Sequence, residues 1–319
     1  MRAIIVHKSG ELSIEEISTP EIQKEEILIR VEACGVNRAD LMQKIGRYPA
    51  PKGTRDDILG LEFAGVVERC GAGTSMWKCG DRVMGIVSGE AYAEYVVLHE
   101  RLLLPIPQGL SFEEAACIPE AFLTAYDALF LQLMLKTGDR VLIHAIGSGV
   151  GDAAYQLARH RDIAVVGTTR SAWKLSSYRD LDTGIVVSEG NFISQLPGKV
   201  DAVLDFVGGG YLGQNIKALR REGRMLLLGL LGGAKDECSL GSILVKRLHI
   251  MGSTLRSRRF EEKVILVSEF RKRALPLFEC SVLTPTLDTI FAWTRAEEAH
   301  EYMKKNANRG KVVLRIERD

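Results

Sequence analysis

Three glycines, spaced two positions apart, follow an apolar run near the middle of the chain. The run, residues 141–143, predicts a strand, and a helical pattern starts at the third glycine. A strand, a glycine-rich turn and a helix form the layout of a dinucleotide pyrophosphate site, for a nicotinamide or flavin nucleotide. Because Ile146 and Ser148 occupy the first two glycine positions of the usual G-x-G-x-x-G pattern, the turn also fits an ordinary strand–helix connection. The expected nucleotide contacts are Gly147, Ser148, Gly149, Val150 and Gly151.

Basic residues follow the next predicted strand, residues 163–168. Sites that prefer NAD place Asp or Glu here to bind the ribose 2′-hydroxyl, and this chain has no acid at that place. The planar fork of Arg170 and the point charge of Lys174 suit the 2′-phosphate of NADP, although both also fit surface charges at a helix start. The sequence therefore favours NADPH, with predicted contacts at Thr169, Arg170, Ser171 and Lys174.

The secondary structure that positions these residues changes in type along the chain. Short apolar or alternating runs, residues 82–86 among them, are separated by Gly, Pro and Asp over the first hundred or so residues and predict a β-rich module. Residues 38–44 predict a helix, and Ser111 with Glu114 predicts a capping box that opens another. From Asp139 onward strands and helices alternate, which is typical of a parallel, doubly wound sheet in an α/β fold. The tail after residue 258 predicts a return to the β-rich module. Ligands of such folds bind at the carboxyl ends of the parallel strands, so we expect substrate in an interdomain cleft.

The charge balance argues against a nucleic-acid or membrane partner. The 42 basic and 41 acidic residues give a net charge of +1, too little to attract a polyanion. We expect the densest basic patch, residues 256–259, to be solvated surface, with a phosphate-binding role as the alternative. No apolar segment is long enough to span a bilayer. The six cysteines form no C-x-x-C pair, which argues against disulfide and zinc frameworks and favours a reducing, cytoplasmic location.

Six segments spread over the whole chain carry a family resemblance. They are residues 33–40, 59–66, 118–126, 138–145, 204–209 and 309–314. With these segments the chain resembles the medium-chain dehydrogenase/reductase superfamily, and most of all its zinc-free quinone oxidoreductase branch. The resemblance implies a GroES-like catalytic domain over 1–117, a Rossmann NADP-binding domain over 118–257 and a return to the catalytic domain over 258–319. It also implies hydride transfer from NADPH and a homodimer formed through the Rossmann sheets.

The resemblance bears on the metal as well. Zinc-bearing members have a cysteine at the position of Asn37 and a histidine at that of Leu61. An amide and an aliphatic side chain cannot replace a thiolate and an imidazole on Zn²⁺, so we predict no metal site. Without a Lewis acid an alkoxide is hard to stabilise, which disfavours alcohols as substrates. Conjugated hydride acceptors, such as quinones and α,β-unsaturated carbonyls, are favoured.

The resemblance implies further site residues, each with an ordinary structural alternative. Asn37 would orient the nicotinamide carboxamide or bind substrate oxygen, and Asp40 is either catalytic or a helix-start acid. Tyr48 would stack on a quinone ring and supply a proton, or is a structural loop residue. Thr124 would lie beside the nicotinamide, or bonds back to a helix carbonyl. We expect Glu62 to tether elements near the site. The remaining predicted cofactor contacts are Phe206, Val207, Gly229, Leu230, Ser253, Leu255, Asn306 and Lys311.

One segment departs from the family pattern. The segment of residues 173–198 is shorter than the corresponding segment in relatives. In relatives a tyrosine packs on the adenosine phosphate, and here Val187 lies near that position. Binding of that phosphate is therefore expected to be weaker. We expect His144, after the first strand of the nucleotide domain, to pack or hydrogen-bond near the turn. The sequence predicts an NADPH-dependent quinone reductase. An enone or alkenal double-bond reductase and a non-catalytic NADPH sensor stay open as alternatives.

Overall fold

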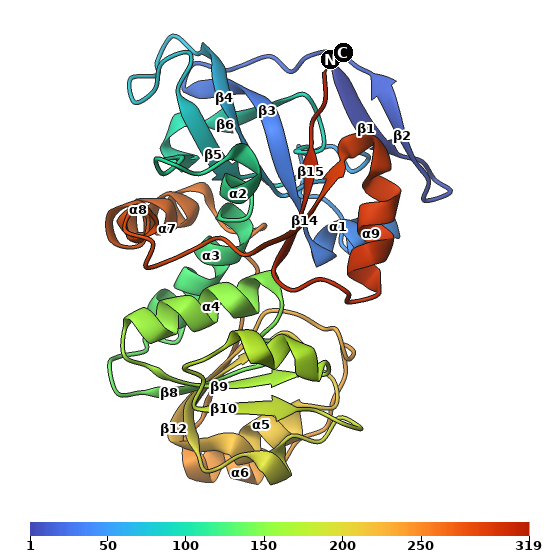
Figure 1. The fold of residues 1–319 in the computed structure, drawn as a ribbon. Coiled ribbons are helices and arrows are strands. Elements are labelled where there is room, and N and C mark those ends of the chain that lie inside the picture. The colour runs from blue at the N-terminus through green and yellow to red at the C-terminus, as the bar shows by residue number, and fades with distance from the viewer. Residues whose placement is uncertain (319) are drawn as a thin grey trace. The chain divides into compact units, whose positions relative to one another are not determined.

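A computed structural model describes residues 1–318, which form two compact units (Figure 1). One unit combines Met1–Leu123 with the chain from Leu255 onward, and the other is Thr124–Thr254. These divisions lie close to, but not at, the predicted boundaries 117/118 and 257/258. No helix in the described part of the chain is long and apolar enough to cross a membrane.

The first unit is built on a mostly antiparallel sheet with the order β14-β15-β3-β4-β5-β7, in which β6 also pairs with β3. A separate hairpin pairs β1 with β2. Only β14 and β15 run parallel, and β15 pairs antiparallel with β3, so the end of the chain completes this sheet. The strands are β1 (Arg2–Val6), β2 (Leu12–Glu16), β3 (Glu26–Val36), β4 (Glu62–Cys70), β5 (Arg82–Ile86), β6 (Tyr95–His99), β7 (Leu103–Pro105), β14 (Leu287–Ala292) and β15 (Lys311–Arg315).

Short helices connect these strands, and their starts follow local capping rules. The predicted capping box at Ser111 is confirmed, since Ser111 Oγ accepts from Glu114 N at 3.1 Å and Ser111 N donates to Glu114 Oε2 at 2.8 Å. The pattern also predicted the bounds of α1 correctly. The helices are α1 (Arg38–Lys44), α2 (Phe112–Ala115), α3 (Pro119–Tyr126), α7 (Phe260–Arg273), α8 (Pro276–Glu279) and α9 (Ala296–Lys304), and α3 ends in the second unit.

The second unit is a six-stranded parallel sheet with the order β10-β9-β8-β11-β12-β13. Counted from β8, this is the 3-2-1-4-5-6 order of a dinucleotide-binding sheet, whose switch point lies between β8 and β11. The strands are β8 (Arg140–Ile143), β9 (Ala164–Thr169), β10 (Thr183–Val186), β11 (Val200–Asp205), β12 (Leu219–Leu227) and β13 (His249–Gly252). The α/β fold predicted from the sequence is therefore confirmed.

Helices cover both faces of this parallel sheet. Figure 1 shows α4 (Gly149–His160) on one face, with α5 (Leu212–Ala218) and α6 (Leu240–Lys246) on the other. Every residue of β11 is buried, as expected for a strand with helices on both sides. The pattern did not predict β10, because only Ile185 of its four residues is buried and the strand lies at the sheet edge.

Close packing of β3 against β4 gives a test of the first unit. A Cβ at Gly65 would lie 2.2 Å from the carbonyl oxygen of Arg30, so the Gly65→Ala variant forces the two strand backbones apart. We expect a loss of about 3 kcal/mol in the free energy of unfolding. Urea unfolding followed by tryptophan fluorescence, to which the buried Trp293 of this unit contributes, measures it.

Gly213→Ala is the matched control. Gly213 lies in α5, and the nearest atom to an added Cβ is 3.7 Å away, an ordinary contact. Alanine favours helix over glycine, so stability should stay the same or rise by up to about 1 kcal/mol. Equal losses in the two variants would contradict the packing argument.

Candidate active site

A buried cluster in the first unit contains Asn37, Glu62 and Lys311. These residues meet because β3 pairs with both β4 and β15: Asn37 follows β3, Glu62 begins β4 and Lys311 begins β15. The Lys311 ammonium lies 2.5 Å from Glu62 Oε1 and 2.5 Å from Asn37 Oδ1, and Asn37 Nδ2 donates to Glu62 Oε1 at 2.9 Å. Three residues far apart in sequence therefore form one hydrogen-bonded group.

The charges of this cluster compensate each other. The side chain of Glu62 is fully buried and that of Lys311 is 6% exposed. Burial alone would lower the pKa of Lys311, but the charge of Glu62 and its hydrogen bond outweigh burial and raise that pKa above the ordinary value. Lys311 therefore stays charged as the partner of Glu62.

Glu62 also anchors the start of α3, as a tether should. Its second oxygen, Oε2, accepts from the backbone N–H of Glu120 at 2.7 Å. A Cβ at Gly35 would lie 2.1 Å from Glu62 Oε1, so only glycine lets the carboxylate approach β3 this closely. Glu62 thus joins two strands of the sheet to the helix that follows.

Asp40 is fully buried and surrounded by donors. Its carboxylate accepts from Asn37 N at 2.7 Å, from Gly60 N at 3.2 Å and from the Tyr92 hydroxyl at 3.2 Å. Burial raises the pKa of Asp40 to about 6, although these bonds and Lys311 lower it. The helix-start interpretation accounts for its contacts, and a catalytic role stays a prediction.

Arg256 fixes the loop that carries Tyr48. Its guanidinium donates to Ser88 O at 2.6 Å, to Tyr48 O at 3.2 Å and to Gln43 Oε1 at 2.7 Å. It also lies 5.0 Å from the centre of the Tyr48 ring, in cation–π range. Arg256 is 7% exposed, so the expectation that patch 256–259 is solvated is wrong for this residue, because loop carbonyls satisfy its donors.

The surroundings of Tyr48 make its phenol a poor acid. Burial, followed by the charge of Glu120, raises the pKa of the Tyr48 phenol, and Arg256 lowers it. The net direction makes the phenol a weaker proton donor than in water.

Glu120 was missed by the sequence analysis. It is half-buried at the start of α3, and within residues 1–318 its carboxyl makes no hydrogen bond or ion pair. Desolvation, followed by the charge of Glu62, raises the pKa of Glu120 to about 8 against the effects of Lys311 and Arg256. Its position after Pro119 signals only a first-turn acid, so the sequence gives no hint of this environment.

The glycine-rich turn of the second unit is supported by its own side chains. Ser148 Oγ accepts from Gly151 N at 3.1 Å and caps α4. A Cβ at Gly151 would lie 2.5 Å from Ala145 O, so helix and turn pack too closely for any other residue. A helix start leaves its first amides without intrahelical acceptors, and these fit a phosphate.

Lys174 covers this turn. Its side chain is 8% exposed, and its Cδ would lie 2.6 Å from a Cβ added at Gly147. Arg170 is exposed, and Thr169 Oγ1 accepts from Ser171 N at 3.1 Å. The predicted residues for the 2′-phosphate therefore end β9 and continue into the segment that lies over the turn.

Tyr178, which the sequence analysis did not single out, supports the same turn. The Tyr178 hydroxyl oxygen lies 2.9 Å from Ile146 O and 2.9 Å from Asp152 Oδ1, both hydrogen-bond acceptors for its proton. His144 lies beneath, fully buried, with Nδ1 2.9 Å from Thr168 Oγ1 and Nε2 2.8 Å from Asn215 Oδ1. The prediction that His144 hydrogen-bonds near the turn is confirmed.

The predicted cofactor contacts that follow β11 and those that follow β12 lie on adjacent loops. Leu231 N donates to Phe206 O at 3.2 Å, and Gly232 N donates to Val207 O at 2.7 Å, so the two loops are paired through their backbones. Gly229 and Leu230 belong to the second of these loops, and Ser253 N donates to Leu227 O at 3.0 Å. These predicted residues therefore share one edge of the parallel sheet.

The other predicted residues have separate surroundings. Thr124 Oγ1 is buried and has no hydrogen-bond partner among residues 1–318, which fits a contact with a bound molecule. Leu255 is buried in the first unit, and Asn306 Oδ1 accepts from Arg38 at 2.8 Å. With Lys311 bonded to Glu62, cofactor roles for Asn306 and Lys311 stay predictions.

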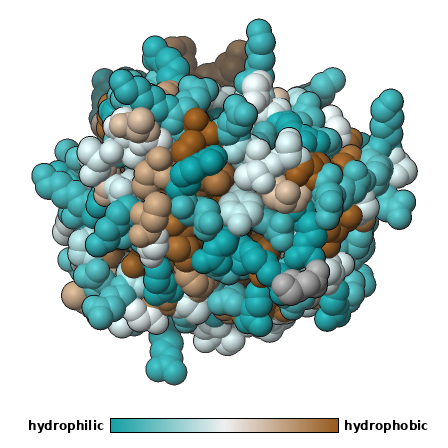
Figure 2. Space-filling view, turned by 90° about the horizontal axis from the view of Figure 1, so that it is seen from above, coloured by the Kyte–Doolittle hydropathy of each residue, from teal (hydrophilic) through white to brown (hydrophobic). Residues whose placement is uncertain are grey.

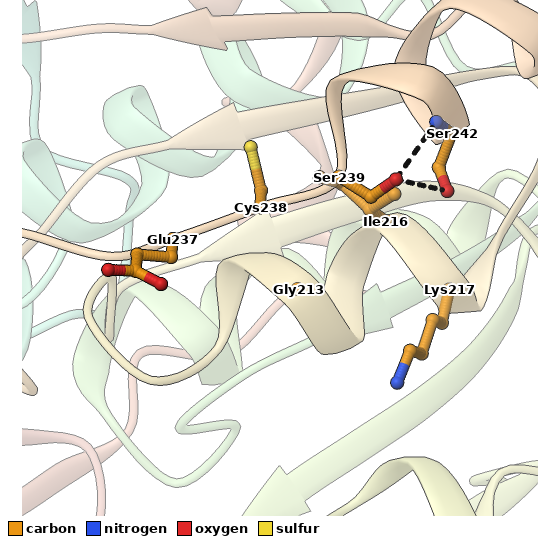
Figure 3. A pocket seen from close by; sticks show the side chains of 7 residues that line it. All are labelled: Gly213, Ile216, Lys217, Glu237, Cys238, Ser239 and Ser242. Atoms are coloured by element: carbon orange, nitrogen blue, oxygen red, sulfur yellow. Dashed lines mark hydrogen bonds between the residues drawn. The ribbon is translucent and has the colours of Figure 1, made fainter.

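A pocket on the second unit lies away from every predicted residue. Figure 3 shows it between α5 and α6, where Ser239 Oγ accepts from Ser242 N at 3.3 Å. Its lining residues are Gly213, Ile216, Lys217, Glu237, Cys238, Ser239 and Ser242. The residues of the candidate site therefore do not coincide with this pocket. Within 1–318, no group of three or more His, Cys, Asp or Glu side chains could hold a metal ion.

Two family models match the chain. The model described as an alcohol dehydrogenase GroES-like domain matches residues 23–108, and the model described as a zinc-binding dehydrogenase matches residues 149–269. The first model covers Asn37 and Glu62, and the second begins within the glycine-rich turn, at Gly149.

Known proteins match over the full length. The mouse synaptic vesicle membrane protein VAT-1 homolog-like is 29% identical, over 100% of this chain and 82% of its own length. Human quinone oxidoreductase is 29% identical, over 98% of this chain and 97% of its own. The solved structure of the JamJ enoyl reductase has a TM-score of 0.87 at 26% identity, with 99% of each chain covered.

The chain belongs to the medium-chain dehydrogenase/reductase superfamily, in its quinone oxidoreductase branch. Members of this superfamily are oxidoreductases that bind nicotinamide cofactors. The predicted family and the predicted GroES-like plus Rossmann fold are confirmed.

The ion pair of Glu62 and Lys311 gives a test of the cluster. Lys311→Met leaves the fully buried Glu62 without its cation, and we expect a loss of about 3–5 kcal/mol in the free energy of unfolding at pH 7. Urea unfolding measures it.

Lys304→Met is the matched control. Lys304 pairs with Glu301 at 2.9 Å, and both side chains are mostly exposed. Exposed pairs contribute little, so stability should not change measurably. A loss in Lys311→Met no greater than in this control would refute the role of the buried pair.

Proposed function

We propose that this protein is an NADPH-dependent quinone oxidoreductase that works without zinc. The observation that carries the proposal is the environment of Asn37, whose amide is bonded to Lys311 and to Glu62, the residue that follows the buried Leu61. An amide and an aliphatic side chain at these positions provide no Zn²⁺ ligands. The similarity to human quinone oxidoreductase over nearly the whole chain supports the substrate class.

The second unit provides the features that suit the cofactor. The start of α4 offers amides for the pyrophosphate, and Lys174 over Gly147 places a positive charge beside that turn. Exposed Arg170 is free to bind a 2′-phosphate with its planar fork. NADPH, when bound, supplies the hydride. The buried hydroxyl of Thr124 has an unused hydrogen-bonding capacity for such a ligand.

The residues of this chain then contribute position and charge. Holding the reactants in a productive orientation is the main catalytic effect that we propose, because no metal ligand set is present at Asn37 and Leu61. Arg256 holds Tyr48 in its loop, which would present the phenol ring to a flat conjugated substrate. The similarity to an enoyl reductase keeps a double-bond reductase as the second candidate.

Oxidation of NADPH and NADH by the purified protein, with 1,2-naphthoquinone, 1,4-benzoquinone and an alkenal as acceptors, tests the function. We expect fast quinone reduction with NADPH and slow reduction with NADH. Arg170→Ala should raise the KM for NADPH about tenfold and leave the KM for NADH unchanged, since a charge-assisted contact to the 2′-phosphate is lost. Arg179→Ala, which removes another exposed arginine of the same segment, is the control.

Each other outcome changes the assignment. Turnover with the alkenal alone favours the double-bond reductase. NADPH binding without turnover favours a cofactor sensor, and no binding of either nucleotide contradicts the nucleotide site itself.

We also propose a homodimer formed through the parallel sheets. Strand β13 is an edge of its sheet, with Ile250 39% exposed, and the nearby helix α6 exposes Leu240, Leu244 and Val245. An unpaired strand edge beside an exposed apolar helix can bind a second copy of the chain. With a two-fold axis, the β13 edges of the two copies pair and join the two sheets into one. By contrast, the face shown in Figure 2 is largely hydrophilic, with only scattered apolar side chains.

Leu244→Glu tests this surface. Leu244 is 78% exposed, so the added charge should leave the fold intact and weaken an apolar interface. Light scattering coupled to size exclusion should give twice the chain mass for the wild type and the single-chain mass for the variant. Val282→Glu, an exposed apolar position of the other unit, should stay dimeric. A monomeric wild type would refute the dimer.

A further inference from the structure

Glu120 stands at a fixed place beside the buried cluster. Its backbone N–H donates to Glu62 Oε2 at 2.7 Å, and Glu62 is in turn bonded to Asn37 and Lys311. Because Glu62 is fully buried and immobilised by these contacts, the first turn of α3 cannot shift independently of the cluster. The backbone of Glu120 is therefore held beside the cluster.

Charged groups from several elements act on the Glu120 carboxyl. Those of like sign are Glu62 and Asp40, and those of opposite sign are Lys311, Arg256 and Lys263; the Tyr48 phenol is also within electrostatic reach. Both Arg256 and Lys263 are already held by other acceptors: Lys263 donates to Arg256 O at 2.8 Å and to Ser88 Oγ at 3.2 Å. Neither cation pairs with Glu120.

The three carboxyl groups of this region are used differently. Glu62 pairs with a lysine, and Asp40 accepts three hydrogen bonds, whereas the Glu120 carboxyl has no partner within residues 1–318. Desolvation and Glu62 raise the pKa of Glu120 to about 8, so the group carries its proton at pH 7. A helix-start acid that served the helix dipole would be ionised, so that explanation does not account for a neutral Glu120.

We propose that Glu120 is the general acid of the reduction and donates its carboxyl proton to the substrate oxygen that becomes negatively charged. The proposal rests on the function proposed above. The hydride adds two electrons and one hydrogen to the conjugated substrate; the O–H bond of Glu120 breaks and an O–H bond forms on the substrate. Water then returns a proton to the carboxylate, so one hydride and one proton give the reduced product.

Glu120 fits this role better than Tyr48. A general acid works best when its pKa lies near the operating pH, and the pKa of Glu120, about 8, meets that condition. The pKa of Tyr48 is raised above its ordinary value of 10, so it lies further from the operating pH. Tyr48 keeps the role of shaping the loop beside Arg256.

The pH dependence of kcat/KM for NADPH-dependent quinone reduction tests the role. Glu120 is protonated below its pKa, so wild-type kcat/KM should be high below pH 8 and fall above it. Glu120→Gln cannot donate a proton, and we expect kcat/KM to drop about 100-fold and lose that fall. Glu120→Asp should retain part of the rate and the fall at high pH. Tyr48→Phe should keep the fall, and Glu301→Gln, at an exposed position, should behave as wild type.

A second readout needs no turnover. In cofactor-free protein labelled with ¹³C at the glutamate carboxyl carbons, one signal should titrate with a midpoint near pH 8 and be absent in Glu120→Gln. Absence of any glutamate titrating above pH 6 would overturn the proposal. So would a Glu120→Gln variant with wild-type kcat/KM, although quinone turnover by the wild type would leave the proposed function intact. If the wild type reduces neither quinone nor alkenal, the proposed function and the role of Glu120 fail together.

Discussion

The ion pair between Glu62 and Lys311 is the interaction on which the candidate site depends. Taking both charges out of water costs several kcal/mol per ion, and their attraction offsets this only with good geometry and further hydrogen bonds. Asn37 and the backbone of Glu120 supply those bonds, and Gly35 leaves the space for them. The pair therefore contributes less to the stability of the fold than to its conformational specificity. Its bonds are satisfied in one arrangement of β3, β4, β15 and α3, which places groups from distant parts of the sequence at defined positions.

That arrangement separates three carboxyl groups by their partners. Glu62 has a cation, Asp40 has hydrogen-bond donors, and Glu120 has neither, although all three lie in one region of the first unit. Burial raises the pKa of both Asp40 and Glu120, and the hydrogen bonds to Asp40 lower its value again, so the pKa is about 6 for Asp40 and about 8 for Glu120. When the environments of neighbouring acids shift their pKa values apart, one site can hold a charged and a neutral carboxyl at the same pH.

The sequence predicted what local patterns determine. The bounds of α1 and β5, the capping box at Ser111 and the alternation behind the parallel sheet depend on residues close together in the chain, and they were predicted correctly. Strand β10 was not, because an edge strand with one buried side chain has almost no hydrophobic period.

The environments of Glu120 and Arg256 could not be predicted for a different reason. The side chain of Arg256 is bonded to residues 168 to 213 positions away. The charges around Glu120 come from other segments of the chain, the nearest of them Glu62, 58 positions away. Composition and spacing show a basic patch and a helix-start acid; only the tertiary contacts show that one is buried and the other unpaired. The prediction of no metal site depends only on the residue types at Asn37 and Leu61 and not on tertiary contacts, and it stays a prediction.

The cap that Ser148 places on α4 has a consequence for ligand binding. Because Ser148 Oγ already bonds Gly151 N, and Tyr178 holds Ile146 O from the other side, the turn keeps its shape without any bound phosphate. A preorganised loop loses little conformational entropy when a ligand arrives. The same cap uses one amide of the turn. In the nucleotide site that we propose, selectivity among nucleotides would therefore depend less on the backbone of the turn than on the side chains of Lys174 and Arg170, where single substitutions can change it.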